Sequence, residues 1–177
     1  MEPLPVVTGG KSGLCVMRGF TIVELMTVVA VLAVLLALAA PSFNAIMERW
    51  RVRQTVESLR SSLYYARSEA IRRGGNVVMQ KLDGGKGCAA GGGDDWSCGW
   101  VVTGDGSTLQ RFDAPSNVSV LRSEDEGEIS FDRWGMTSAN MGVGFELYPK
   151  DKTGSDPSAS CLNLSSGGRI RIVPCSS

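Results

Sequence analysis

One apolar run near the N-terminus limits what this chain can fold into. Residues 20–40 carry no charge except that of Glu24, and a run of about 20 apolar residues has the length of a helix that crosses a bilayer core. A carboxylate inside such a run is costly because it loses its hydration, so it usually has a charged partner and a function. We therefore predict a transmembrane helix over 20–40 and a specific role for Glu24.

An ordinary secretory signal, cleaved after Ala37-Leu38-Ala39, is the alternative interpretation of this run. The acid within the apolar segment and the weakly basic region before it disfavour that interpretation. Arg18 and Gly19, a basic and a small residue directly before the run, instead suit a processing site at the start of the run.

The junction Gly19-Phe20-Thr21-Ile22-Val23-Glu24-Leu25 resembles the class III signal of type IV pilins and pseudopilins. The resemblance implies that residues 1–19 are a leader, that a prepilin peptidase cuts after Gly19, and that Phe20 is then N-methylated. It also implies that Glu24 neutralises the amine of Phe20 in a neighbouring subunit, because two buried charges are tolerated only when they are matched. The implied location is the inner membrane, as a single-pass protein, and then a periplasmic or extracellular pilus filament.

A second helical pattern follows Pro41, a residue that loosens or kinks a helix. Gly74-Gly75 then marks the helix end. One helix over 20–73 would be about 80 Å long at 1.5 Å per residue, too long for one small domain. We therefore expect residues 20–40 to lie in the membrane or filament core and residues 41–73 to pack on a globular head. The apolar residues recur at three- and four-residue spacing with a jump after Trp50: Phe43, Ile46, Met47, Trp50, Val56, Leu59, Leu63, Ala66 and Ala70.

From Asn76 the apolar period changes to two, which is typical of strands, and residues 74–177 are expected to form the globular head. The predicted fold class is therefore α+β, with a long N-terminal hydrophobic helix packed on an antiparallel, β-sheet-rich globular head. The candidate strands are 76–82, 99–103, 109–112, 118–121, 128–131, 144–148, 161–164 and 169–173.

Three segments are similar to the GspH/FimT family, which includes pseudopilin H of type II secretion and the FimT and FimU minor pilins. These segments are Leu63-Tyr64-Tyr65-Ala66-Arg67-Ser68-Glu69-Ala70, Trp96-Ser97-Cys98-Gly99-Trp100-Val101-Val102 and Ile129-Ser130-Phe131-Asp132-Arg133-Trp134-Gly135. The resemblance implies the type IV pilin fold and assembly with other major and minor pilins or pseudopilins. We expect Trp96, Trp100 and Trp134 to pack in the core or at strand edges.

Five cysteines are present, and Cys15 lies in the predicted leader. The even count after the leader indicates disulfides in an oxidising compartment. Of the three possible connectivities we favour Cys88–Cys98 and Cys161–Cys175, which close short loops. A zinc site is disfavoured because two close Cys-x-x-Cys pairs are missing.

Near the C-terminus, alternation predicts Arg169 and Arg171 on one strand face, roughly 7 Å apart, where each could meet a DNA phosphate. Gly168 would permit close approach, and Lys150 and Lys152 would assist. Gly168-Arg169-Ile170-Arg171 resembles the Gly-Arg-x-Arg motif of FimT-type minor pilins, which bind DNA for uptake in natural transformation. The alternative is a final strand with two solvated arginines.

The residue content argues against an enzyme. The chain has no histidine, no nucleophile elbow and no metal-ligand cluster, so we predict no catalytic residue, cofactor or metal. Its 18 basic and 18 acidic residues give no overall attraction to nucleic acid. Asp94-Asp95 and Glu124-Asp125-Glu126 are interpreted as solubilising acids. The resemblance implies a FimT-like minor pilin that binds DNA in natural competence; the alternative is a FimU-like structural subunit or a type II secretion pseudopilin H without DNA binding.

Overall fold

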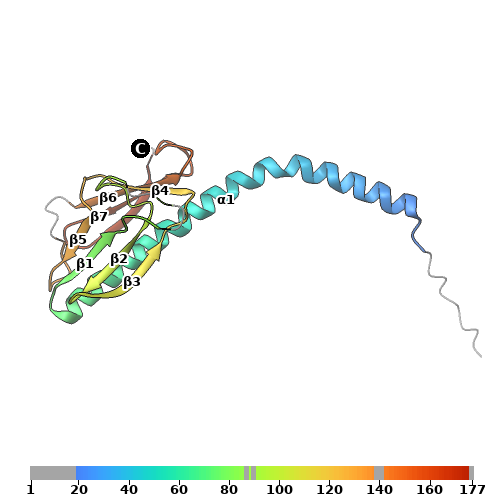
Figure 1. Ribbon diagram of the computed structural model, residues 1–177. Helices are drawn as coiled ribbons and strands as arrows, with labels where there is room; N and C mark the ends of the chain where they lie inside the picture. The colour runs from blue at the N-terminus through green and yellow to red at the C-terminus, as the bar shows by residue number, and fades with distance from the viewer. Residues whose placement is uncertain (1–18, 86–87, 89–90, 138–141, 176–177) are drawn as a thin grey trace, which may run out of the picture. The chain divides into compact units, whose positions relative to one another are not determined.

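The computed structural model describes residues 19–85, 88, 91–137 and 142–175, without the side chains of 38–42. The predicted leader, apart from Gly19, lies outside the described residues. The chain divides into two compact units, Met1–Pro41 and Ser42–Ser177. The single helix of the described chain, α1, runs from Ile22 to Arg73 and so has residues in both units (Figure 1).

The N-terminal end of α1 is capped by its own sequence. Thr21 precedes the helix, and its hydroxyl oxygen accepts a hydrogen bond of 3.2 Å from the backbone N–H of Glu24. Thr-x-x-Glu is the pattern of a capping box, in which the residue before the helix accepts from the third helical residue. An acid in the first turn also interacts favourably with the helix dipole.

The structure describes the backbone of the predicted transmembrane segment, 20–40, but not the side chains of its residues 38–40. Within the part of the chain that is described, no helical segment is long and apolar enough to cross a membrane.

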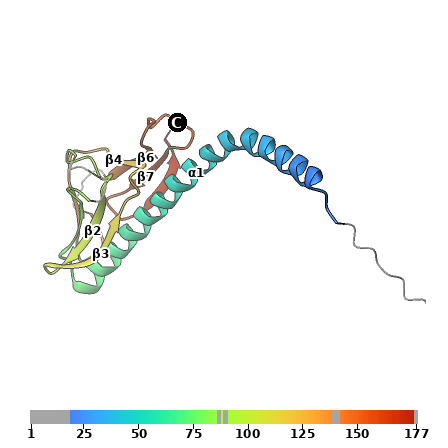
Figure 2. The same ribbon diagram turned by 45° about the vertical axis from the view of Figure 1, so that its right-hand side comes forward.

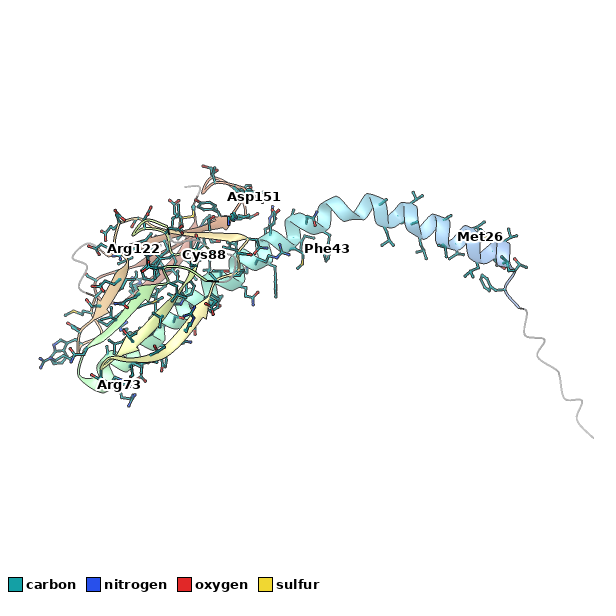
Figure 3. All side chains as sticks on the ribbon, viewed as in Figure 1. Met26, Phe43, Arg73, Cys88, Arg122 and Asp151 are labelled. Carbon is teal, nitrogen blue, oxygen red and sulfur yellow. A yellow bond between two sulfur atoms is a disulfide. The ribbon has the colours of Figure 1, made fainter. Side chains whose placement is uncertain are left out.

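The C-terminal half of α1 packs on the β-rich part of the Ser42–Ser177 unit (Figure 2). Its buried stripe begins at Val52. Three apolar residues precede it, Phe43 (labelled in Figure 3), Ile46 and Trp50, and their side chains are 62%, 62% and 59% exposed. The jump in spacing after Trp50 therefore marks a change from an exposed to a buried apolar face. The stripe consists of Val52, Val56, Leu59, Leu63, Ala66 and Ala70.

Two glycines end α1. Gly74 has a φ of +79°, and the N–H of Gly75 donates to the carbonyl oxygen of Ala70 over 2.8 Å. This six-to-one hydrogen bond is that of a Schellman motif, in which a residue without Cβ takes the left-handed conformation at low cost. The chain can then turn directly into the first strand.

The described residues contain eight strands, which form two antiparallel four-stranded sheets (Figure 1). The first sheet has the order β3-β2-β1-β5 and the second the order β4-β6-β7-β8. Their bounds are Val77–Lys81 (β1), Gly99–Gly104 (β2), Ser107–Asp113 (β3), Val118–Arg122 (β4), Glu128–Phe131 (β5), Val143–Pro149 (β6), Ser160–Leu164 (β7) and Ile170–Pro174 (β8). These spans confirm the predicted α+β fold of a helix packed on an antiparallel β-rich head.

One hydrophobic core joins α1 to both sheets, with Leu59, Met79 and Leu162 as fully buried members. Trp96 meets Phe145 edge-on at 5.3 Å between ring centroids, and Trp100 stacks on Phe112 at 4.6 Å. The predicted core packing of Trp96 and Trp100 is therefore confirmed.

Trp134 does not follow the prediction, because its side chain is 71% exposed. The physical reason is the turn that carries it. The carboxylate of Asp132 accepts hydrogen bonds from the backbone N–H groups of Trp134 and Met136, at 2.8 and 2.9 Å. This turn holds the indole away from the core.

A charged cluster ties the end of α1 to the β2–β3 turn. Glu69 accepts hydrogen bonds from Arg72 and Arg73, and Arg73 also pairs with Asp105 at 2.9 Å. The bonds from Arg72, followed by those from Arg73, lower the pKa of Glu69 from 4.5 to about 2. The folded state therefore favours the ionised carboxylate.

This lowered pKa makes the contribution of Glu69 to stability depend on pH. Because the pKa is lower in the folded state, the contribution is complete above about pH 4.5 and is lost as the pH falls through about 2. In urea unfolding, we expect the wild type to be more stable than Glu69→Gln by an amount that is constant near neutral pH. This difference should decrease as the pH falls from about 4.5 to about 2. Glu57→Gln, whose carboxylate is 58% exposed and contacts Arg60 at 3.5 Å, is the control and should show a smaller difference. An equal difference at pH 2 and pH 7 for Glu69→Gln would contradict the expectation.

Candidate functional site

The predicted Gly-Arg-x-Arg segment forms the turn and second strand of the β7–β8 hairpin. The N–H of Ser165 donates to the carbonyl oxygen of Arg169 over 2.9 Å, and the N–H of Arg169 donates to the hydroxyl of Ser165 over 3.0 Å. A disulfide between Cys161 and Cys175, with their Cα atoms 4.9 Å apart, closes the open end of the hairpin. The segment is thus fixed at both ends.

Arg169 and Arg171 are both exposed. Arg171 pairs with Asn163 of β7, whereas Ile170 between the two arginines packs against the core. Because side chains alternate along a strand, this register directs both arginines to the outer face of the second sheet. Arg169 itself directly precedes β8, which begins at Ile170.

Both arginines line an open groove with a volume of about 560 Å³. Its lining includes a row of paired residues from three neighbouring strands, Gly144, Asn163 and Arg171. A Cβ at position 144 would lie 3.0 Å from the hydroxyl oxygen of Ser123 and 3.4 Å from the amide oxygen of Asn163. The missing side chain of Gly144 therefore leaves the space beside Ser123 and Asn163 free.

The charges of the groove are uneven. Neither Arg169 nor Arg171 forms a salt bridge with any described residue. Glu124, on the β4 side, pairs with Arg122 at 3.3 Å. One wall thus presents two uncompensated guanidinium groups, which can bind an anion.

Gly168 has a different environment from the predicted one. It is buried with a φ of +77°, and its carbonyl oxygen accepts a hydrogen bond of 2.9 Å from Arg67 of α1. A Cβ at position 168 would lie 2.8 Å from the guanidinium carbon of Arg67. The glycine therefore makes room for an arginine of the same chain.

Arg67 also contacts the neighbouring turn. A Cβ at Gly135, where φ is +73°, would lie 2.8 Å from Cγ and 2.9 Å from Nε of Arg67. This positioning role of Arg67 was not predicted, because its signal in the sequence is weak: Arg67 lies in a helical segment that ends close to the first strand.

The two predicted helper lysines are not part of the groove. Lys150 follows the far end of β6, about 20 Å from Gly144 at 3.3 Å per residue. Lys152 pairs with Glu48 at 2.7 Å and Asp156 at 3.3 Å, and these hydrogen bonds raise its pKa. Its charge is already compensated.

The predicted processing and assembly residues lie in the other unit. Gly19 and Phe20 precede α1, and the side chain of Phe20 is exposed. The carboxylate of Glu24 is exposed and forms no salt bridge with the described part of this single chain.

The cysteines pair as favoured from the sequence. Cys88 is bonded to Cys98 and Cys161 to Cys175, with the first pair 5.4 Å apart between Cα atoms. Across the described ranges, no group of three or more His, Cys, Asp or Glu side chains could hold a metal ion.

Comparisons with known proteins agree with this architecture. A family model described as type II transport protein GspH matches residues 55–168. The pilin-like protein PilA1 of Thermus thermophilus is 29% identical over 156 residues, which cover 88% of this chain and 91% of PilA1.

Solved structures show the same fold. Two crystal structures of the type IV minor pilin FimU of Pseudomonas aeruginosa superpose with TM-scores of 0.55 and 0.58, each at 23% identity. They cover 71% and 75% of this chain and 94% and 95% of the FimU chains.

Proposed function

This chain belongs to the GspH family of minor pilins and pseudopilins, and from that membership we propose that it is a minor type IV pilin that binds DNA without sequence preference. Arg169 and Arg171 are the proposed DNA-binding residues, and DNA uptake in natural transformation is the proposed role. Members of the family assemble with other pilins or pseudopilins, so the proposed site would lie on a filament subunit.

The observation that carries the DNA proposal is the pair of uncompensated arginines on one wall of one groove. Phosphate oxygens are the natural ligands of such groups, and contacts to the phosphate backbone carry no base sequence. Two phosphate contacts release about two counterions, so log K is expected to fall with log salt with a slope of about −1.8.

The assembly proposal concerns the N-terminal unit. We propose that a prepilin peptidase removes the leader after Gly19, that the subunit is held in the inner membrane before assembly, and that Glu24 then neutralises the amine of Phe20 in an adjacent subunit. The exposed carboxylate of Glu24, beside exposed apolar residues such as Ile22 and Leu25, supports this proposal, because such a charge needs a partner once it leaves water.

Replacing both arginines tests the DNA proposal. We expect Arg169→Ala/Arg171→Ala to weaken binding of a labelled duplex about a hundredfold at 50 mM salt and to remove most of the salt slope, because each lost phosphate contact is worth about tenfold there. The measurement is fluorescence anisotropy on the full chain in non-ionic detergent.

The matched control for this experiment is Arg49→Ala/Arg53→Ala, which removes the same charge from two exposed positions of α1. Equal affinity of the wild type and the Arg169→Ala/Arg171→Ala variant for DNA would contradict the proposal. So would an equal loss in the control variant, since binding would then follow net charge alone.

A structural subunit without a nucleic-acid ligand is the second candidate. The exposed apolar residues Phe43, Ile46 and Trp50, spaced by three and four along α1, favour it, because this face suits contact with an apolar helix of another subunit. In a deletion strain complemented with Arg169→Ala/Arg171→Ala, lost DNA uptake with intact twitching supports the DNA role. Loss of twitching as well supports the structural role.

A further inference from the structure

We propose that the site extends to Trp134, whose indole stacks on a base of single-stranded DNA while Arg169 and Arg171 hold the phosphates. The inference rests on the proposed function. It adds a base-stacking residue and a preference for unpaired strands, neither of which follows from the two arginines alone.

The first step is the exposure of Trp134 on an ordered turn. Its side chain is 71% exposed, whereas the other phenylalanine, tyrosine and tryptophan rings among the described residues of 74–175 are buried or partly buried. Exposing a large ring to water costs free energy, and such a ring on a rigid support is typical of a binding site.

The rigidity of this turn comes from Asp132. Its carboxylate accepts from two backbone N–H groups of the turn, its own N–H donates to the carbonyl oxygen of Met136 over 2.9 Å, and its carbonyl oxygen accepts from Gly135 over 2.9 Å. The backbone of the turn is therefore already ordered, so little conformational entropy is lost when the indole of Trp134 binds a ligand.

The second step is the proximity of this turn to the arginines. The N–H of Thr137 donates to the carbonyl oxygen of Ser166 over 3.0 Å, which joins the two turns directly. The two turns also flank the same side chain, because a Cβ added at Gly135 or at Gly168 would lie 2.9 Å from Nε of Arg67. Trp134 and Arg169 are the chain neighbours of these two glycines, each one Cα–Cα step of about 3.8 Å away.

The third step is the charge around the ring. Arg133, next to Trp134, forms no salt bridge within the described ranges, and Arg67 donates to a carbonyl oxygen rather than to a carboxylate. Arginines without acidic partners beside an exposed ring are the combination that binds single-stranded nucleic acids. An apolar protein partner would leave these charges buried and unmatched.

Single strands are preferred for a geometric reason. In a duplex each base is stacked between its neighbours, so an external ring cannot reach its face, whereas an unpaired base offers that face. Among the described residues, none that lines the groove of Arg169 and Arg171 is aromatic, so stacking depends on Trp134.

The test compares single-stranded and duplex probes of the same sequence, about 12 nucleotides long, by fluorescence anisotropy on the full chain in non-ionic detergent. Trp134→Ala is expected to weaken binding of the single strand about tenfold and to change binding of the duplex by less than about twofold. Trp134→Phe, which keeps a smaller ring, should retain most of the affinity for the single strand. Trp50→Ala, which removes another exposed tryptophan, is the control and should change neither affinity.

Each outcome decides something different. If the wild type binds single strands and Trp134→Ala binds them equally well, the stacking inference is wrong and the two-arginine site stands. If Trp134→Ala weakens both probes equally, the ring has no stacking role. If the wild type binds neither probe, the proposed function itself fails. If Trp134→Ala leaves DNA binding intact but prevents assembly with other pilins, the turn is a protein contact and the inference is overturned.

Discussion

Replacing Gly99 with alanine is expected to abolish folding of the β-rich head or to lower its stability by about 4 kcal/mol or more. Gly99 begins β2 with a φ of +108°. An added Cβ would overlap the carbonyl oxygen of Phe112 and lie 2.8 Å from the backbone nitrogen of Ala114. These are backbone atoms of or beside β3, the strand that pairs with Gly99, so they cannot move aside without opening the β2–β3 pairing.

Gly106→Ala is the matched control for this prediction. Gly106 also has a positive φ, +76°, but a Cβ there would meet nothing within 4 Å. The control should lose only the cost of a left-handed alanine, about 1–2 kcal/mol. Urea unfolding followed by tryptophan fluorescence measures both variants, and equal losses would show that crowding at Gly99 is relieved by local movement. A larger loss for Gly99→Ala than for Gly106→Ala would also explain why a glycine stands between Trp96 and Trp100, in the segment that resembles the GspH/FimT family.

Arg122→Ala is expected to destabilise the protein by about 3 kcal/mol, because it removes a buried, charged donor and leaves the carbonyl groups that it binds without this partner. The side chain of Arg122 is 1% exposed (Figure 3). Its Nη1 donates to the carbonyl oxygens of Glu126 and Glu128, at 2.7 and 2.8 Å, and its Nη2 donates to the carboxylates of Glu124 and Glu126. These bonds hold the loop between β4 and β5.

An exposed arginine provides the control for Arg122. Arg111 pairs with Asp113 at 2.8 Å, but its side chain is 52% exposed. Arg111→Ala should therefore change stability much less than Arg122→Ala in the same urea titration, because the exposed pair is screened by water. Equal effects of the two substitutions would mean that the loop carbonyls find other donors when Arg122 is absent.

The fold class could be predicted because its signals are local. The change from helical to alternating periodicity coincides with Gly74-Gly75, and these two residues end α1 by a backbone motif that only the neighbouring turn determines. The strand order could not be predicted in the same way. β1 lies between β2 and β5, and the pairing of β1 with β5 depends on contacts between residues about 50 positions apart.

Buried and exposed side chains of one type were harder to separate from the sequence. Glu124 and Glu126 were expected to be solubilising acids, but both bind Arg122, which the alternation of β4 directs inward with Val118 and Val120. The three tryptophans of the family-like segments differ for a comparable reason. Trp134 is exposed because Asp132 closes a turn around it, and this closure depends on side-chain hydrogen bonds rather than on apolar spacing.

For the candidate site, strand alternation was enough to place Arg169 and Arg171 together, but the groove beside them was not predictable. Its lining includes Gly144 of β6, and only the pairing of β6 with β7 brings that residue next to Asn163. Lys150 and Lys152 follow the end of β6 that lies far from the groove. Their position shortly before the Gly-Arg-x-Arg segment in the sequence therefore did not bring them near it in space.

The hydrogen bond from Arg67 to the carbonyl oxygen of Gly168 has a mechanical consequence. When a bound ligand pulls on the turn that carries the arginines, the force reaches α1 directly through the side chain of Arg67. It also reaches the sheet through β8, which is hydrogen-bonded to β7. The hydrogen bond that resists this force runs from a charged guanidinium donor to a carbonyl oxygen, and such bonds are among the stronger hydrogen bonds of a protein. The turn is therefore anchored to the long helix of the subunit as well as to its sheet.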